Sequence, residues 1–175
     1  MKTLLSEAEL QGGVRRLADE INRFYAGRPL TIVGILTGSI VLLADLIRQL
    51  EMPLRVGVLQ ASSYRQGTTR GSIVINSDLL LDVHRRDVLL VDDIFDTGHT
   101  ILEIGALLEK MGASSVRSAV LLRKLGRQEV DLQPDFVGFE IPNEFVVGYG
   151  LDYHDLYRNL RHLAALEPHE IIGSP

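Results

Sequence analysis

The chain has 175 residues, of which 46% are hydrophobic and 23% are charged, and its formal net charge at pH 7 is −5. This length and composition are typical of one compact domain with a substantial core, and they exclude a disordered chain. The chain has no cysteine, which excludes disulfides and thiolate zinc sites. Its negative charge argues against nonspecific binding to nucleic acid or anionic membranes but leaves room for a local basic pocket.

The sequence has no apolar run near the roughly 18 residues of a membrane span. The first seven residues also lack the apolar core of a signal peptide. We therefore expect a cytoplasmic enzyme or regulator, with a single domain over residues 1–175.

An amphipathic helix is predicted near the N-terminus. Ser6 and Glu9 have the spacing of a capping box, and apolar residues follow at steps of three and four. These residues are Leu10, Val14, Leu17, Ile21 and Phe24. Gly12 and Gly13 lie inside the pattern and cost the helix about 1 kcal/mol each relative to alanine. The pattern ends before Pro29.

The next unit is a strand, a short turn and a helix. Residues 31–36 form a mostly apolar run typical of a buried strand, and residues 40–50 have helical spacing. Between them, Thr37, Gly38 and Ser39 offer hydroxyls and backbone amides at a helix start, where anions bind. The same residue types are ordinary turn formers, so spacing alone leaves both interpretations open.

Residues 54–61 are predicted as the next strand, and a polar stretch follows over residues 62–72. Tyr64 is the only apolar anchor of this stretch. A connection of this length is often a lid or a binding loop, although a plain surface loop is the alternative. Residues 73–76 and 79–81 are expected to form a strand pair beneath it.

The most distinctive stretch is a strand, an acidic turn and a helix start in succession. Residues 88–91 are β-branched and aliphatic, the pattern of a strand buried on both faces of a parallel sheet. Asp92 and Asp93 end this run, and Asp96 precedes a Thr-Gly-His-Thr turn at residues 97–100. The free amides of such a turn suit a phosphate group. The acids suit a metal ion, ribose hydroxyls or proton transfer.

Three further strands are predicted towards the C-terminus, at residues 115–122, 136–141 and 145–147. The alternation of strands and helices predicts an α/β fold, a doubly wound and mostly parallel sheet with helices on both faces. Lys124 follows an inner strand and can reach into a pocket, although a lysine at a strand end more often faces solvent. Phe145 is by pattern alone more typical of a core residue than of a ligand platform.

The sequence Val-Leu-Leu-Val-Asp-Asp-Ile-Phe-Asp-Thr-Gly-His-Thr, residues 88–100, resembles the phosphoribosyl-diphosphate-binding motif of the type I phosphoribosyltransferases. The resemblance extends over most of the chain, from residue 36 to Arg158. Residues 134–142 and 145–153 resemble the base-binding hood of the hypoxanthine-guanine branch. The implied fold is the type I phosphoribosyltransferase fold with a small hood formed by the N- and C-terminal segments.

That resemblance implies an activity in purine salvage. The enzyme would transfer the 5-phosphoribosyl group from phosphoribosyl diphosphate to hypoxanthine, and also to guanine, giving IMP or GMP and pyrophosphate. Asp96 would be the general acid/base beside N7 of the purine. The implied cofactor is Mg²⁺, with Asp92, Asp93 and Asp152 as its ligands.

The resemblance also assigns binding roles. The residues implied at the ribose 5′-phosphate are Asp92, Asp93, Asp96, Thr97, Gly98, His99 and Thr100. Those implied at the pyrophosphate are Thr37, Gly38 and Arg158. Those implied at the purine are Lys124, Phe145, Val146 and Asp152. Lys124 would donate to O6 and so favour 6-oxopurines over adenine, Phe145 would stack on the ring, and Ser63 and Tyr64 would belong to a lid that excludes water.

Three positions depart from the family pattern. Asp92 stands where the family often has glutamate, and Thr37 stands where some relatives carry lysine or arginine. His99 occupies a variable position of the motif. The shorter Asp92 side chain is expected to shift its hydroxyl contact, and Thr37 cannot form the salt bridge of a basic residue.

Other interpretations compete with this one. A nucleotide-sensing regulator on the same fold would need a basic face, and an enzyme with xanthine preference would differ only in its base. A phospho-acceptor receiver domain is excluded because its acids are spread over several strands, whereas here they share one turn. The expected partners are small-molecule substrates, with no nucleic acid or membrane, and the family analogy implies a homodimer or homotetramer.

Overall fold

The computed structural model describes residues 1–63, 73–77 and 81–171, apart from the side chains of residues 62 and 63. The helices of this part are α1 (Glu7–Tyr25), α2 (Ile40–Ile47), α3 (His99–Lys110) and α4 (Pro168–Ile171). The strands are β1 (Lys2–Leu5), β2 (Leu30–Leu36), β3 (Leu54–Ser63), β4 (Ile73–Asn76), β5 (Asp87–Phe95), β6 (Ser115–Lys124), β7 (Phe136–Ile141), β8 (Val146–Val147) and β9 (Leu163–Ala165).

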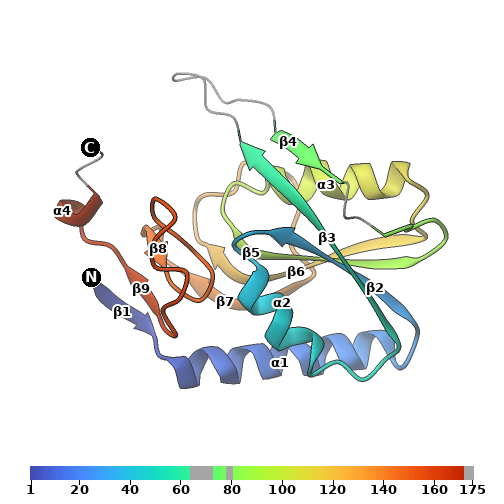
Figure 1. Ribbon diagram of the computed structural model, residues 1–175, viewed down its shortest axis with the longest axis horizontal. Coiled ribbons are helices and arrows are strands. Elements are labelled where there is room, and N and C mark those ends of the chain that lie inside the picture. Colours follow the sequence, from blue (N-terminus) through green and yellow to red (C-terminus); the bar gives the residue numbers. More distant parts are fainter. Residues whose placement is uncertain (64–72, 78–80, 172–175) are drawn as a thin grey trace.

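Six strands form the main sheet in the order β4-β3-β2-β5-β6-β7. Neighbouring strands are parallel except for β4, which runs antiparallel to β3 at one edge. Helices α1 and α2 cover one face and α3 covers the other (Figure 1). The structure thus confirms the predicted doubly wound, mostly parallel sheet.

The central strand β5 shows why the sheet needs helices on both faces. Val88 and Leu90 pack into the core under α3, whereas Leu89 and Val91 pack into the core under α1 and α2. All four side chains are fully buried. Because successive side chains of a strand point to opposite faces, a continuous apolar run is stable only when both faces are covered.

The chain reverses its direction of winding between β2 and β5. From β2 it passes through α2 to β3 on one side, and from β5 it passes through α3 to β6 on the other side. Ligands of such sheets bind at the carboxyl ends of the two strands that flank this switch. Pairing of β2 with β5 ends at Gly34 and Val91, whereas pairing of β5 with β6 continues to Phe95 and Arg123. Within the described residues, the edge of β5 that faces β2 therefore has no strand partner beyond Val91.

Helix α1 begins with the predicted capping box. The Ser6 side chain accepts a hydrogen bond from the Glu9 amide, and the Glu9 carboxylate accepts one from the Ser6 amide at 2.8 Å. Packing explains the glycine at position 13, because a Cβ there would overlap the Phe139 ring of β7. The glycine that weakens the helix therefore permits its close approach to the sheet.

A second sheet, in the order β1-β9-β8, joins the two ends of the chain (Figure 1). Both of its strand pairs are antiparallel. The stretch 134–142 was expected in the hood, and this expectation was wrong for its strand. Residues 136–141 form β7, which pairs with β6 in the main sheet because Phe136 and Ile141 are buried in the core under α1.

Other boundaries also differ from the predictions. Residues 73–76 pair with β3, whereas their predicted pairing with residues 79–81 stays a prediction, because residues 79 and 80 lie outside the described part of the chain. Asp92 and Asp93 do not follow β5 but lie inside it, because β6 continues to pair with this stretch. Within the described residues, none of the helices has both the length and the hydrophobicity for a membrane crossing.

Candidate active site

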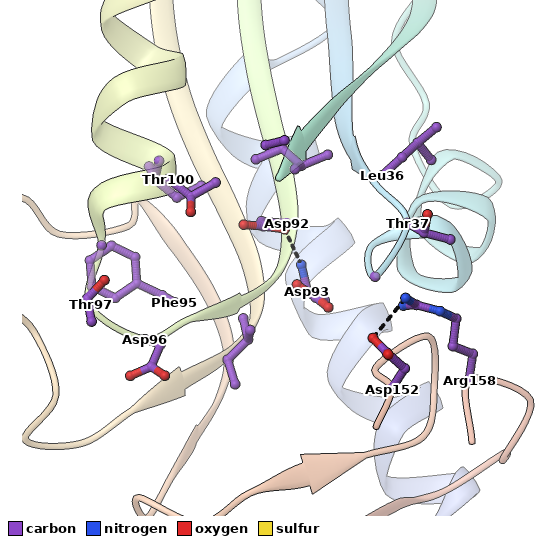
Figure 2. A pocket seen from close by; sticks show the side chains of 16 residues that line it. Leu36, Thr37, Asp92, Asp93, Phe95, Asp96, Thr97, Thr100, Asp152 and Arg158 are labelled. Carbon is purple, nitrogen blue, oxygen red and sulfur yellow. Dashed lines mark hydrogen bonds and ion pairs between the residues drawn. The ribbon is translucent and has the colours of Figure 1, made fainter. Parts of the chain in front are cut away.

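A cavity of about 320 Å³ lies at the carboxyl ends of β2 and β5 (Figure 2). Its wall comes from four parts of the chain: the end of β2 with the turn after it, Ala61 of β3, the end of β5 with the start of α3, and the segment after β8. The polar residues that line it are Thr37, Gly38, Asp92, Asp93, Asp96, Thr97, Gly98, Thr100, Asp152 and Arg158. The cavity therefore opens at the position that the topology of the sheet favours.

Asp92 and Asp93 form a pair of carboxylates at the base of the cavity. Asp92 is only 7% exposed, and its Oδ1 accepts a hydrogen bond of 3.0 Å from the Asp93 amide. Burial raises the pKa of Asp92 well above its usual value, and the neighbouring Asp93 charge adds to the shift. Burial also raises the pKa of Asp93, while the Arg158 charge opposes that shift.

This pair suits a cation or hydroxyl donors. Among residues 1–63, 73–77 and 81–171, neither Asp92 nor Asp93 forms an ion pair with lysine or arginine. Buried carboxylates that lack a partner are costly, and a bound divalent ion or the hydroxyls of a sugar would lower that cost. Oxygen ligands of this kind are the ones that Mg²⁺ prefers.

The turn after β2 brings backbone groups close to Asp93. The peptide bond between Leu36 and Thr37 is cis. A Cβ at Gly38 would overlap the Asp93 carboxylate, and a Cβ at Gly150 would overlap the Gly38 carbonyl. Gly38 is thus enclosed between β5 on one side and the segment after β8 on the other, which leaves no room for a side chain.

The turn before α3 presents backbone amides to the cavity. Gly98 is the N-cap residue of α3 with φ of 91°, a left-handed conformation that favours glycine, and no side chain caps the helix. The first amides of a helix have no intrahelical partner and attract anions. Thr97 and Thr100 also line the cavity. The start of α3 is therefore a suitable phosphate seat.

Asp96 lies on the other side of the turn from Asp92 and Asp93 (Figure 2). Its carboxylate contacts two cations: Lys124 Nζ lies 3.4 Å from Oδ2, and Arg127 Nε lies 2.9 Å from Oδ1. Lys124 is 12% exposed and Asp96 is 35% exposed. The hydrogen bond from Arg127 to Asp96 raises the pKa of the Arg127 guanidinium. The three groups form one charged cluster at the edge of the cavity.

Asp152 and Arg158 form the opposite wall (Figure 2). Arg158 Nη2 lies 2.8 Å from Asp152 Oδ1, and Arg158 Nη1 donates to the Gly150 carbonyl at 2.7 Å. Asp152 Oδ2 accepts a hydrogen bond of 2.9 Å from the Asp155 amide. These bonds fix the arginine beside the Gly38 turn, where it can neutralise a second anionic group.

Comparison with known proteins agrees with this geometry. The phosphoribosyl transferase domain model matches residues 2–154. A hypoxanthine-guanine phosphoribosyltransferase of Staphylococcus epidermidis is 41% identical over 165 residues, which cover 94% of this chain and 92% of that protein. The chain belongs to the hypoxanthine-guanine phosphoribosyltransferase family.

Solved structures of this family have the same fold. A hypoxanthine phosphoribosyltransferase from Staphylococcus aureus matches with a TM-score of 0.91 and 39% identity, over 97% of this chain and 92% of that chain. A hypoxanthine-guanine phosphoribosyltransferase from Bacillus anthracis matches with a TM-score of 0.90 and 36% identity, over 95% of this chain and 99% of that chain. The type I phosphoribosyltransferase fold implied by the motif is thereby confirmed.

Some residues that were predicted for the site do not line the cavity. His99 is directed to Glu129, with 3.1 Å between Nε2 and Oε2. Phe145 is 42% exposed and packs edge-on against Tyr153, with 5.3 Å between ring centroids, whereas Val146 is buried in β8. Lys124 reaches the site through its contact with Asp96. Tyr64 and the side chain of residue 63 lie outside the described part of the chain.

Two neighbours of the site were not predicted. Arg127 contacts Asp96, and the Glu129 amide donates to the Thr97 carbonyl at 3.0 Å. Both belong to the connection between β6 and β7. Their only signal in the sequence is that they closely follow Lys124 at a strand end, which does not indicate the direction of the loop.

Proposed function

We propose that this chain transfers the 5-phosphoribosyl group of phosphoribosyl diphosphate to hypoxanthine, and also to guanine, giving IMP or GMP and pyrophosphate. The observation that carries the proposal is the position of Asp96. Asp96 lies just before the start of α3, which suits a phosphate group, and it also contacts Lys124, the residue proposed to bind the purine. The cytoplasm is the proposed location, and residues 1–175 are proposed to act as one catalytic domain with a hood from both chain ends.

The donor is proposed to bind along the turn that follows Asp92. The amides and hydroxyls of residues 97–100 would hold the 5′-phosphate, and Asp92 and Asp93 would face the ribose 2′- and 3′-hydroxyls. The pyrophosphate would lie against the backbone of Thr37 and Gly38 and against Arg158. This division is supported by the anion-binding capacity of a helix start and by two adjacent acids that, among the described residues, have no ion pair with lysine or arginine.

Mg²⁺ is the proposed cofactor. Asp92 and Asp93 would hold it through the donor, and Asp152 would help to hold a second ion. Asp92 is buried, Asp93 is half-buried, and within the described residues neither forms an ion pair with lysine or arginine; together with their oxygen donors, this fits such an ion. When bound, Mg²⁺ would neutralise charge on the pyrophosphate leaving group.

The purine is proposed to bind between Lys124 and Phe145. Lys124 would donate to O6, which distinguishes 6-oxopurines from adenine, and Phe145 would stack on the ring. Carbonyls near Val146 and Asp152 would meet the 2-position. Xanthine remains an alternative base, because Lys124 recognises the oxygen at C6 and not the group at C2.

The residues of this chain would then perform the transfer as follows. Asp96 would accept or share the proton at N7 while the base attacks C1′ of the ribose. The fixed dipoles of the turn and the charge of Arg158 would stabilise the separating charges of an oxocarbenium-like transition state. Water must be excluded meanwhile, and the proposed lid that begins at Ser63 and Tyr64 would serve that purpose.

A panel of four purines tests this proposal. Purified protein, Mg²⁺ and phosphoribosyl diphosphate are mixed with hypoxanthine, guanine, xanthine or adenine, and nucleotide formation is followed by absorbance. We expect turnover with hypoxanthine and guanine and none with adenine. Turnover with adenine but with none of the other purines, or failure to turn over any of the four, would refute the proposed function.

Two further measurements use the same preparations. Sedimentation analysis tests the proposed homodimer or homotetramer, and a shift assay with bulk RNA tests the expected absence of nucleic-acid binding.

A further inference from the structure

The connection between β6 and β7 is attached to the proposed donor turn at several successive residues. Arg127 contacts Asp96, and the Glu129 amide donates to the Thr97 carbonyl. The Glu129 carboxylate lies 3.1 Å from the His99 ring. Residues 127–130, here called the clamp segment, therefore follow the turn in space and fix its conformation.

Glycine at position 98 makes this attachment close. A Cβ there would overlap Val130 as well as the Phe95 ring. The backbone of the clamp segment is stabilised by its own Gln128 side chain, which donates to the Val130 and Leu132 carbonyls at 2.7 and 3.0 Å. Arg127 thus projects from a loop whose following residues are held by hydrogen bonds.

The two cations that contact Asp96, Lys124 and Arg127, would have different roles in the reaction. Under the proposed function, Lys124 must turn to O6 of the purine, but in this structure its Nζ lies 3.4 Å from Asp96. If Lys124 were the sole partner, Asp96 would compete with the purine for it and would lose its orientation when the base binds. Arg127 is the partner that does not have to leave, since its shorter contact of 2.9 Å is made to the other carboxylate oxygen.

We propose that Arg127 is a positioning residue for the transfer reaction: it holds the Asp96 carboxylate towards N7 of the purine and releases Lys124 to bind O6. This inference rests on the proposed function. Arginine suits the role because its guanidinium is planar and keeps its charge, whereas a lysine would offer a freely rotating point charge. The matched neighbour is Arg123, which contacts Gln128 of the clamp segment and Glu140 but not Asp96.

Steady-state kinetics of Arg127→Gln, Arg127→Lys and Arg123→Gln test the proposal. We expect Arg127→Gln to lower kcat about fivefold, the upper range for a partly exposed ion pair, and to raise KM for hypoxanthine. KM for phosphoribosyl diphosphate should stay near the wild-type value. Arg127→Lys should recover part of kcat, and Arg123→Gln should match the wild type. Equal losses in Arg123→Gln and Arg127→Gln would overturn the proposal, because they would indicate general loosening of the loop.

A double-mutant cycle with Asp96→Asn separates positioning from folding. If Arg127 acts through Asp96, then Arg127→Gln should change kcat little when Asp96 is already asparagine. A further fivefold loss in that background would refute the proposal. Activity of the wild type distinguishes failure of the proposed function from failure of this inference. Absence of IMP formation by the wild type would refute the proposed function. An active wild type with an equally active Arg127→Gln would refute only the role of Arg127.

Discussion

Apart from Arg158, the residues proposed for the donor come from two short turns at adjacent strand ends, whereas those proposed for the purine come from separate segments of the chain. These two turns, residues 37–38 and 92–100, are here called the donor side, and they are fixed by the main sheet and by α3. The base side consists of Lys124, Arg127, Phe145 and Asp152, which come from β6, the loop after it, and the segments before and after β8. The donor side is therefore a local, rigid motif, and the base side is an assembly of distant parts.

This difference teaches how the two substrates can be recognised independently. Substitutions on the donor side should mainly change the kinetic constants for phosphoribosyl diphosphate, because the backbone groups proposed to bind it are held by close packing. Substitutions on the base side should mainly change the kinetic constants for hypoxanthine, because individual side chains are proposed to bind it. Asp96 is the exception, since it lies on the donor turn but contacts the cations of the base side.

The largest effect is expected from Gly38→Ala on the donor side. The added methyl group overlaps the Asp93 carboxylate and must displace either the turn or the acid. A displacement near 1 Å at a reacting centre costs on the order of 10²-fold in rate, and we expect this loss in kcat/KM for phosphoribosyl diphosphate. The control is Gly105→Ala in α3, where a Cβ meets nothing within 4 Å. Wild-type kinetics in Gly38→Ala would contradict the account.

A large effect on the other side is expected from Lys124→Gln. Loss of a charged donor to O6 should lower kcat/KM for hypoxanthine by roughly 10- to 100-fold. KM for phosphoribosyl diphosphate should change little, and discrimination against adenine should narrow, because glutamine can also accept a hydrogen bond. Kinetics with both purines check the prediction. A variant that rejects adenine as strongly as the wild type would show that Lys124 does not select the base.

A smaller effect is expected from Phe145→Leu. Loss of ring stacking should cost about 1 kcal/mol of purine binding, or roughly fivefold in KM for hypoxanthine. Phe24→Leu is the matched control, since Phe24 is 41% exposed and Phe145 is 42% exposed, but Phe24 packs against Phe136 and lies in α1. The comparison fails if both variants, or neither, change KM for hypoxanthine.

The smallest effect is expected from Asp92→Asn on the free energy of unfolding. This variant distinguishes the proposed role of Asp92 in binding the donor and Mg²⁺ from any role of its charge in stabilising the fold. Burial raises the pKa of Asp92 in the folded state, so its contribution to stability is complete below the unfolded pKa and is lost as pH rises through the folded pKa. Asp92→Asn keeps an acceptor for the Asp93 amide and removes the charge. We expect it to raise the free energy of unfolding at pH 8 by on the order of 1 kcal/mol, with little change at pH 4.

Urea titration of the protein without substrates and without Mg²⁺ checks this prediction. The same variant should lose activity, because the charge that destabilises the free protein is the one proposed for the donor and Mg²⁺. A variant that is less stable than the wild type at pH 8 would contradict the argument. It would mean that the Asp92 charge is already compensated in the free protein.

Much of the donor side could be predicted because its residues are contiguous. Residues 88–100 contain a strand, the acids and a helix start in one run, so local rules place them at a strand end. Their exact extent could not be predicted, since β5 continues through Asp92 and Asp93 only because β6 pairs with them. Tertiary pairing decided that boundary and not the residues themselves.

The base side was less accessible to sequence reasoning. Lys124 was a candidate by its place at a strand end, but the approach of Arg127 to Asp96 depends on how the loop of residues 125–135 folds back onto the turn before α3. The strand at 136–141 was misplaced in the hood, because its apolar pattern does not reveal which of two sheets it joins. Contacts between distant segments have no periodic signal in the sequence.

The kinetics of Asp96→Asn test the central claim, that a residue of the donor turn performs the chemistry of the base side. The variant keeps the shape of the side chain but cannot accept the purine proton. We predict that kcat for IMP formation falls by on the order of 10²-fold, while KM for phosphoribosyl diphosphate stays within about twofold of the wild type. Turnover equal to that of the wild type, or a loss confined to KM for the donor, would contradict the account.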